Sequence, residues 1–166
     1  MNKNEIKNRI EEVEKELAQL RQDLEKEEKG IWKPDEDECE DYYYIDESGD
    51  TYETYHASSR IDYEHIEFGN YYKTEEEAKY QANVQKYTNL FRKYIEEHSD
   101  LLDWNDDDCI KCFVWYNYEE KCMRYAVSYT TNKSQGTIYA SSERILKNAV
   151  EFVGEDNVIK YVLGVE

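Results

Sequence analysis

The chain has 166 residues, with 21 Lys plus Arg against 39 Asp plus Glu, and its formal net charge is −18. This length allows one compact domain, or a smaller domain with an appendage, and argues against two full domains. Because so negative a surface repels phosphates and anionic lipid headgroups, we expect no direct binding to DNA, RNA or membranes. Aromatic residues form 14% of the chain, which argues against a wholly disordered protein.

The sequence also indicates a cellular compartment. Its apolar runs are only a few residues long, and residues 1–10 lack the apolar stretch of a secretory signal. We therefore expect a soluble, cytosolic protein whose four Cys stay reduced.

Residues 3–29 contain no Gly, Pro or aromatic residue, and their apolar residues recur at alternating spacings of four and three. This spacing predicts a coiled-coil helix within residues 1–30. Its charges favour a parallel homodimer, in which Arg9 faces Glu14 and Glu16 faces Arg21 of the second copy. The alternative is a helix that docks on the protein's own globular part. The predicted dimerisation seam consists of Ile6, Ile10, Val13, Leu17, Leu20 and Leu24.

Residues 31–166 are predicted to form one acidic, Tyr-rich α+β domain, beginning after Gly30 and containing the single proline, Pro34. Two Tyr-rich stretches, 40–46 and 51–56, predict a β-hairpin. Residues 57–72 are mixed in pattern, with a possible short strand near 66–68. Thr74 and Glu77 form a capping-box pattern, which predicts a helix that extends to about His98.

The second half of this domain begins with an acidic loop at residues 103–108. Residues 110–118, 121–130 and 136–140 are then predicted to be three consecutive antiparallel strands with short turns. Ser141 is the expected N-cap of a helix over 142–153 that ends at Gly154, and 158–163 predict one or two final helical turns. The fold class is therefore α+β: an N-terminal coiled-coil helix and a mixed antiparallel-sheet and helix domain.

Motifs for catalysis or metal binding are weak. Cys109 and Cys112 have a CxxC spacing, but they run directly into a strand-forming segment that would place them on opposite faces. With Cys122 they are interpreted as small buried hydrophobic residues, and we expect no bound metal and no cofactor. The three His are scattered, and no nucleotide-binding or nucleophile motif is present, so an enzyme is not expected.

The combination of acidic residues and Tyr is the most distinctive feature of the sequence. Residues 35–56 hold ten acidic residues and no Lys or Arg, interleaved with five Tyr. Such a surface suits a basic protein partner, because carboxylates attract Lys and Arg and Tyr adds rigid contact area. Solubility alone is the alternative reading of the charge. The predicted partner-binding residues are Asp35, Glu36, Asp37, Glu38, Glu40, Asp41, Tyr52, Tyr55, Asp103, Trp104, Asp106, Asp107 and Asp108.

Several segments carry a family resemblance: residues 32–34 (WKP), 42–45 (YYYI), Gly49 and 68–78 (FGNYYKTEEEA). Over residues 31–98, and more loosely over 151–166, the chain resembles small acidic accessory proteins of phages and mobile elements in low-GC Gram-positive bacteria. The resemblance carries no catalytic motif. It implies an inhibitor of host defence, such as an anti-CRISPR or anti-restriction protein, acting in the host bacterial cytosol.

Together these features lead us to expect an inhibitor that binds the basic surface of a nuclease or another nucleic-acid-binding effector. Its carboxylates would occupy the sites that hold phosphates, as a DNA mimic does. The alternative is a structural or adaptor protein, virion-associated or regulatory, that oligomerises through its coiled coil.

Overall fold

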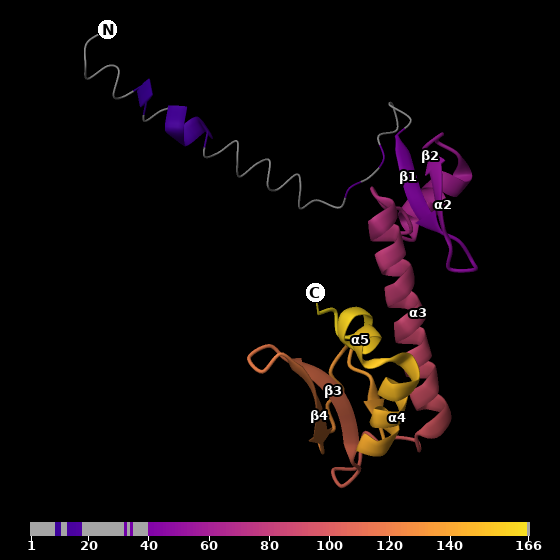
Figure 1. Ribbon diagram of the computed structural model, residues 1–166, viewed down its shortest axis with the longest axis vertical. Helices are drawn as coiled ribbons and strands as arrows, with labels where there is room; N and C mark the ends of the chain where they lie inside the picture. The colour runs from indigo at the N-terminus through magenta and orange to yellow at the C-terminus, as the bar shows by residue number, and fades with distance from the viewer. Residues whose placement is uncertain (1–8, 11–12, 18–31, 33, 35–39, 166) are drawn as a thin grey trace.

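The computed structural model describes residues 9–10, 13–17, 32, 34 and 40–165 (Figure 1). Residues 9–10 and 13–17 are helical, and about half of the Ile10, Val13 and Leu17 side chains is exposed. The rest of the predicted coiled coil lies outside the described residues, including the seam positions Ile6, Leu20 and Leu24. The same holds for the predicted partner-binding residues Asp35, Glu36, Asp37 and Glu38.

The predicted hairpin is confirmed. Strand β1 (Asp41–Ile45) pairs antiparallel with β2 (Thr51–Tyr55), from Asp41 opposite Tyr55 to Ile45 opposite Thr51. In the turn, the carboxylate of Asp46 accepts hydrogen bonds from the backbone N–H groups of Ser48 and Asp50. Gly49 adopts a φ of 86°, a left-handed conformation that favours glycine.

The possible strand at 66–68 is wrong, because this stretch belongs to helix α2 (Arg60–Glu67) and its C-cap. The helix begins with a capping box: the Ser59 hydroxyl, at the N-cap, accepts a hydrogen bond from the backbone N–H of Asp62, and the Asp62 carboxylate accepts one from the backbone N–H of Ser59. After α2, Tyr72 forms an isolated antiparallel bridge with Tyr43 of β1. The two strands and α2 form the N-terminal lobe, which we define as residues 40–77.

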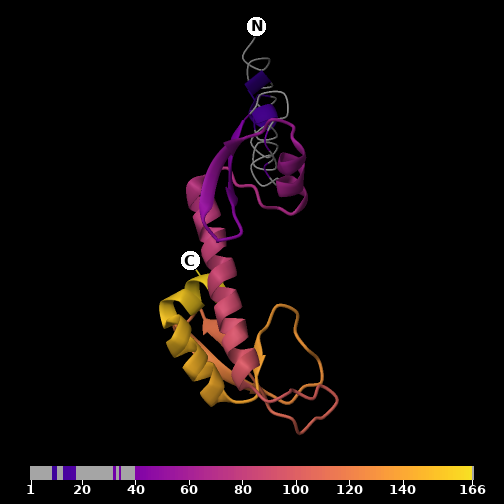
Figure 2. The same cartoon turned by 90° about the vertical axis from the view of Figure 1, so that its right-hand side faces the viewer.

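Helix α3 (Glu75–His98) confirms the predicted capping box, with Thr74 as N-cap and Glu77 at the third position. Its 24 residues span about 36 Å at 1.5 Å per residue. The N-terminal lobe packs at its first turns, and residues 99–165 pack along its middle and its second half (Figures 1 and 2). The buried residues of α3 are Ala78, Phe91 and Ile95.

The C-terminal lobe, residues 99–165, contains the predicted strands: β3 (Lys111–Asn117), β4 (Cys122–Ser128) and β5 (Tyr139–Ala140). The strands pair antiparallel, as predicted, but their order is β4-β3-β5, so the short turn expected to join the second strand to a neighbouring third strand is wrong. The chain between Ser128 and Tyr139 carries β5 to the far side of β3. Helix α4 (Glu143–Val153) has Ser142 rather than Ser141 as its N-cap, and it ends at Gly154 as predicted.

The chain ends in two short helical elements, α5 (Glu155–Asn157) and the π-helix η1 (Val158–Val162). The N–H of Leu163 donates to the carbonyl of Val158, a five-residue spacing that defines the π-helix. Tyr161 of η1 stacks on Tyr87 of α3, with ring centroids 5.1 Å apart. This contact fixes the C-terminal turns against the middle of α3.

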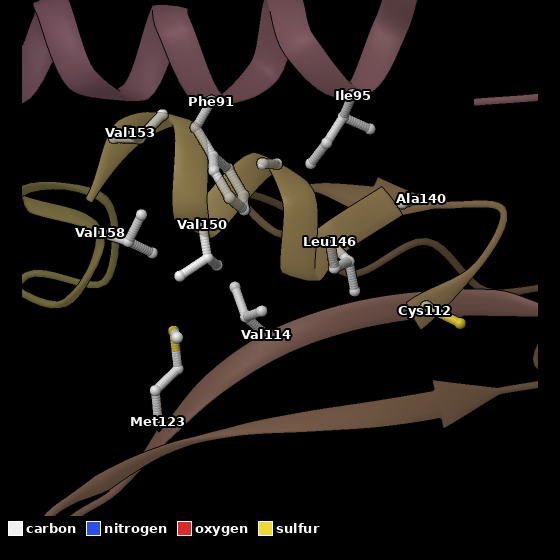
Figure 3. Close-up of a cluster of buried hydrophobic side chains, with 11 residues drawn as sticks. Phe91, Ile95, Cys112, Val114, Met123, Ala140, Leu146, Val150, Val153 and Val158 are labelled. Carbon is white, nitrogen blue, oxygen red and sulfur yellow. The ribbon is translucent and has the colours of Figure 1, made fainter. Parts of the chain in front are cut away.

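The main hydrophobic core lies where α3, α4 and the sheet meet (Figure 3). In this view α4 lies between α3 and β3, so its apolar residues contact both neighbours. The helices with small antiparallel sheets confirm the α+β class. Among the described helices, none is long and apolar enough to cross a membrane. The core residues are Phe91, Ile95, Cys112, Val114, Met123, Ala140, Leu146, Ala149, Val150, Val153 and Val158.

Candidate partner-binding surface

Negative charge is concentrated in the N-terminal lobe. Residues 40–77 hold 12 acidic and 2 basic residues, whereas residues 78–166 hold 14 acidic and 11 basic residues. Eight of the 12 acidic side chains of the lobe are exposed, and the others are half-buried or buried. The acidic surface predicted from the whole sequence is therefore mainly a property of this lobe. The exposed ones are Asp41, Glu47, Asp50, Glu53, Glu67, Glu75, Glu76 and Glu77.

A buried polar network fixes the shape of this lobe. The hydroxyl of Tyr42 donates to the Asp62 carboxylate at 2.8 Å and lies 2.9 Å from Nδ1 of His65. The other carboxylate oxygen of Asp62 accepts hydrogen bonds from the backbone N–H groups of Ala57 and Ser59, at 3.1 and 2.8 Å. Because Tyr42 comes from β1 and Asp62 from α2, the network joins the hairpin to the helix.

The protonation of the network follows from its geometry. Burial acts to raise the pKa of Asp62, but hydrogen bonds from Ser59, Tyr42 and Ala57 outweigh it and lower the pKa to about 2. Burial, with the neighbouring Asp62 carboxylate, raises the pKa of Tyr42. Burial also lowers the pKa of His65, against the attraction of Asp62. At neutral pH the network is therefore a carboxylate held by neutral donors, and it contributes one buried negative charge.

The two predicted Tyr contacts lie on opposite faces of the hairpin. Tyr52 pairs with Tyr44, and Tyr55 pairs with Asp41, so their odd spacing along β2 points them to opposite sides. Tyr52 packs against Tyr44 at 5.9 Å, and Tyr44 stacks on His65 at 4.5 Å. Tyr52 and Tyr55 are both exposed, so each is available to a partner. Because they lie on opposite faces of the hairpin, a single flat partner surface cannot contact both.

Other exposed apolar groups accompany the carboxylates on this lobe. Ile61 and Tyr63 of α2 are exposed, and Phe68 at its C-cap is 81% exposed. Sequence reasoning missed these residues because it assigned no helix to this segment. The lobe thus combines charged and apolar contact groups, as protein-binding surfaces do.

His56 is the other residue that sequence reasoning left unexplained. Its side chain is fully buried, and neither ring nitrogen has a hydrogen-bond partner among the described residues. The ring packs edge-on against Tyr63 at 5.8 Å, and the His56 backbone N–H donates to Glu40. Within the described part of the lobe, the His56 side chain therefore contributes packing contacts rather than hydrogen bonds.

The acidic loop at 103–108 is exposed, as predicted, but it lies at the opposite end of α3 from the hairpin (Figure 1). Asp103, Asp106, Asp107 and Asp108 therefore do not share a surface with Asp41, Tyr52 or Tyr55. A separation of about 36 Å, the length of α3, means that one compact contact cannot include both regions.

Within the loop, Trp104 and Lys111 have structural contacts. Lys111 is fully buried, and its ammonium donates to the carbonyls of Asp106 and Cys109 at 3.0 and 2.9 Å. The same ammonium lies 5.5 Å from the ring centre of Trp104, which also packs edge-on against Tyr139 at 5.1 Å. Trp104 is therefore half-buried within its own lobe rather than presented to a partner.

Trp104 also forms one wall of a groove of about 560 Å³ beside the C-terminal end of α3. The groove is lined by charges of both signs, with Arg92 and Lys133 against Glu96 and Asp100. Its charge is balanced, so it contributes nothing to the negative field of the N-terminal lobe.

The cysteines are separated by the start of the sheet. Cys109 precedes β3, outside the strand predicted at 110–118, and it is half-buried rather than buried as expected, whereas Cys112 lies in β3 and is buried. Burial raises the pKa of the Cys112 thiol. Cys122 begins β4 and is half-buried. The described residues contain no group of three side chains placed to bind a metal ion.

Comparisons with known proteins identify no relative. No family model matches the chain, and neither the curated proteins nor the solved structures include a significant match.

Proposed function

We propose that this chain is a phage-encoded inhibitor of a host nucleic-acid-targeting defence protein, a CRISPR effector or a restriction nuclease, in the bacterial cytosol. The observation that supports the proposal is the charge distribution: 12 acidic residues against 2 basic ones in the N-terminal lobe, most of them exposed. A field of this strength on a small lobe steers it toward a basic surface.

The proposed mechanism is substitution for nucleic acid. Carboxylates spaced along the hairpin and α2 occupy Lys and Arg sites that otherwise hold phosphates. The rigid hairpin–helix network around Asp62 keeps these carboxylates in place, so little conformational entropy is lost on binding. We assign the contact to the N-terminal lobe and residues 35–40, and not to the loop at 103–108 at the other end of α3.

The matched test removes three carboxylates from each lobe. One variant carries Asp41→Asn, Glu47→Gln and Glu67→Gln in the N-terminal lobe. The control carries Asp107→Asn, Glu151→Gln and Asp156→Asn in the C-terminal lobe. All six residues are exposed, so both variants keep the fold and have the same net charge.

The assay measures inhibition of DNA cleavage by a panel of CRISPR effectors and restriction nucleases, then affinity for the inhibited enzyme at several salt concentrations. We expect the N-terminal variant to lose roughly tenfold or more in affinity, with a shallower salt dependence, because fewer ionic contacts remain to be screened. The control should stay within about twofold. Equal losses in both variants, or no inhibition of any enzyme in the panel, would contradict the proposal.

We also propose that the inhibitor is a parallel homodimer joined by residues 3–29. Ile10, Val13 and Leu17 lie on helical segments and are about half exposed, which leaves them available to a second helix. In a parallel coiled coil Leu17 faces its own copy, so a Leu17→Cys variant should form a disulfide-linked dimer. Lys15→Cys, on the outer side of the same helix, is the control. Equal cross-linking of the two variants would refute the parallel seam.

A second candidate function, an oligomeric structural or adaptor protein, is favoured by the same exposed seam. In that case the acidic lobe serves only solubility. Binding that is insensitive to salt, and unchanged in the N-terminal variant, would favour the adaptor over the inhibitor.

A further inference from the structure

Within the described part of the chain, strand β4 is an open edge of its sheet. The sheet order β4-β3-β5 gives β3 a partner on both sides, but β4 a partner on one side only. Among the described residues, no backbone hydrogen bond outside the β3 ladder involves Cys122–Ser128. Figure 1 shows β4 on the side of the sheet that faces away from α3. Its outer N–H and C=O groups are therefore available to another strand.

This edge lacks the usual features that prevent pairing. Natural edge strands are commonly protected by Pro, Lys, a bulge or very short length. β4 has seven residues, pairs with β3 in continuous register without a bulge, and contains neither Pro nor Lys. Its one charged side chain, Arg124, is paired with Glu120. The edge is thus long, regular and nearly uncharged.

The strand is complementary to itself. If two copies of β4 pair antiparallel about Tyr125, all seven residues find a partner, because Tyr125 is the central residue of Cys122–Ser128. Met123 then lies opposite Val127, and Arg124 lies opposite Ala126, so no like charges meet. Met123, Tyr125 and Val127 share the face that packs toward α4, since they pair with Tyr116, Val114 and Cys112 of β3. The pairing extends this apolar face from one copy into the next.

The charge distribution favours a direct contact between two C-terminal lobes over a direct contact between two N-terminal lobes. The C-terminal lobe, residues 99–165, carries 11 acidic and 7 basic residues, so two such lobes repel each other only weakly. Two N-terminal lobes, with 12 acidic against 2 basic residues each, repel strongly. Val127, 49% exposed in the single chain, is an apolar side chain at the open edge that pairing would cover. We propose that β4 pairs with β4 of a second copy of this chain, forming a continuous six-stranded sheet.

The proposal is tested in the full chain by cross-linking. In the proposed register Cys122 lies opposite Ser128 of the second copy, at the Cα separation of directly paired residues, about 4.5 to 5.5 Å. A Ser128→Cys variant should therefore form a disulfide between Cys122 of one copy and the introduced thiol of the other under mild oxidation. The control is Thr130→Cys, which is exposed and lies beyond the end of β4. Mass spectrometry of the linked peptides identifies the bond.

A second substitution checks that the strand edge is the cause. Adding Val127→Lys to the Ser128→Cys variant places a charge in the apolar row opposite Met123, while the long side chain reaches solvent in a single chain. We expect the rate of cross-linking to fall roughly tenfold or more. Trp115→Lys, on the opposite face of β3, is the matched control and should leave the rate within about twofold.

The outcomes are distinct. A Cys122–Cys bond that forms in the Ser128→Cys variant, and is suppressed by Val127→Lys, supports the paired edge. Cross-linking that is absent, or equally fast in the Thr130→Cys control, overturns it. Because a coiled coil at residues 3–29 is tested separately at Leu17, failure of either contact leaves the other result readable.

Discussion

Asp62→Asn is the substitution that best tests the buried network of the N-terminal lobe. Asn keeps the shape of Asp but removes its charge and one of its two acceptor oxygens. In the wild type, the two oxygens accept hydrogen bonds from Tyr42, Ala57 and Ser59. The variant must either present an N–H₂ group to the two backbone donors or lose the hydrogen bond from Tyr42. We expect a loss of about 2 to 3 kcal/mol in the free energy of unfolding, since hydrogen bonds to charged groups contribute about 1.5 to 3.

The lowered pKa of Asp62 expresses the effect of the same hydrogen bonds as a dependence of stability on pH. The folded-state pKa of Asp62 is about 2, below the ordinary value of 3.8. A carboxylate with a lowered pKa stabilises the fold above the unfolded-state pKa, and this stability is lost as pH falls toward the folded-state pKa. The difference corresponds to about 2 kcal/mol, present from about pH 5 upward and roughly halved near pH 3.

The measurement is urea denaturation followed by circular dichroism at several pH values between about 7 and 3. Hydrogen exchange of peptides from residues 41–67 reports whether the loss lies in the N-terminal lobe. The difference in the free energy of unfolding between wild type and variant should decrease by about 1 kcal/mol between about pH 5 and pH 3. Other carboxylates titrate in the same range, but they are common to both proteins and cancel in the difference. Asp41→Asn, exposed in the same lobe, is the control.

A gap below about 0.5 kcal/mol at neutral pH would refute the reasoning, because surface substitutions have effects of that size. So would a gap that stays constant from about pH 5 to pH 3, since it would mean that the carboxylate is not the stabilising group.

Two further substitutions test the C-terminal lobe. Lys111→Met leaves the carbonyls of Asp106 and Cys109 without their hydrogen-bond donor. We expect thermal denaturation to show a loss of about 1 to 3 kcal/mol in the free energy of unfolding, and we expect altered Trp104 fluorescence. A variant as stable as wild type would contradict this, because it would mean that the cost of burying the charge offsets its hydrogen bonds. Phe91→Ala leaves a cavity in the main core and should lower the free energy of unfolding by about 3 to 5 kcal/mol in the same assay. The control, Phe152→Ala, changes a side chain that is 61% exposed and should lower it by less than about 1 kcal/mol. Similar losses in the two variants would contradict the position of the core.

Local signals in the sequence predicted much of the fold. The Tyr-rich stretches around Gly49 and the capping pattern of Thr74 and Glu77 each specify their element within a few residues. Helix α2 has the same kind of signal, Ser59 followed by Asp62, but the alternation of Ile66 and Phe68 around Glu67 resembles a strand and hides the helix. The order of the sheet was missed for a different reason. A two-residue strand such as β5 carries no information about which side of β3 it joins.

The candidate surface was predictable in its charge but not in its arrangement. The excess of acidic residues around the hairpin is visible in the sequence, and the structure places most of them in exposed positions. The sequence alone places the loop at 103–108 in the same predicted set of contacts, because the charge of a residue does not indicate where it lies in the fold. Its separation depends on the length of α3. The burial of Lys111 was equally hidden, because its partners are backbone carbonyls that only the folded loop brings together.

Helix α3 has a consequence for how the protein folds. Its second half buries Phe91 and Ile95 in the main core, whereas its first half buries only Ala78. Starting a helix is the costly step, and extending an existing one is cheap. We therefore expect the C-terminal lobe to supply the nucleus from which the helix grows toward the hairpin. Since the hairpin and α2 pack on turns formed in this way, we expect them to assemble last and to open first. The stability of the N-terminal lobe then depends on that of the C-terminal lobe. We expect mutations in the main core to destabilise the N-terminal lobe as well, because both lobes pack on helix α3.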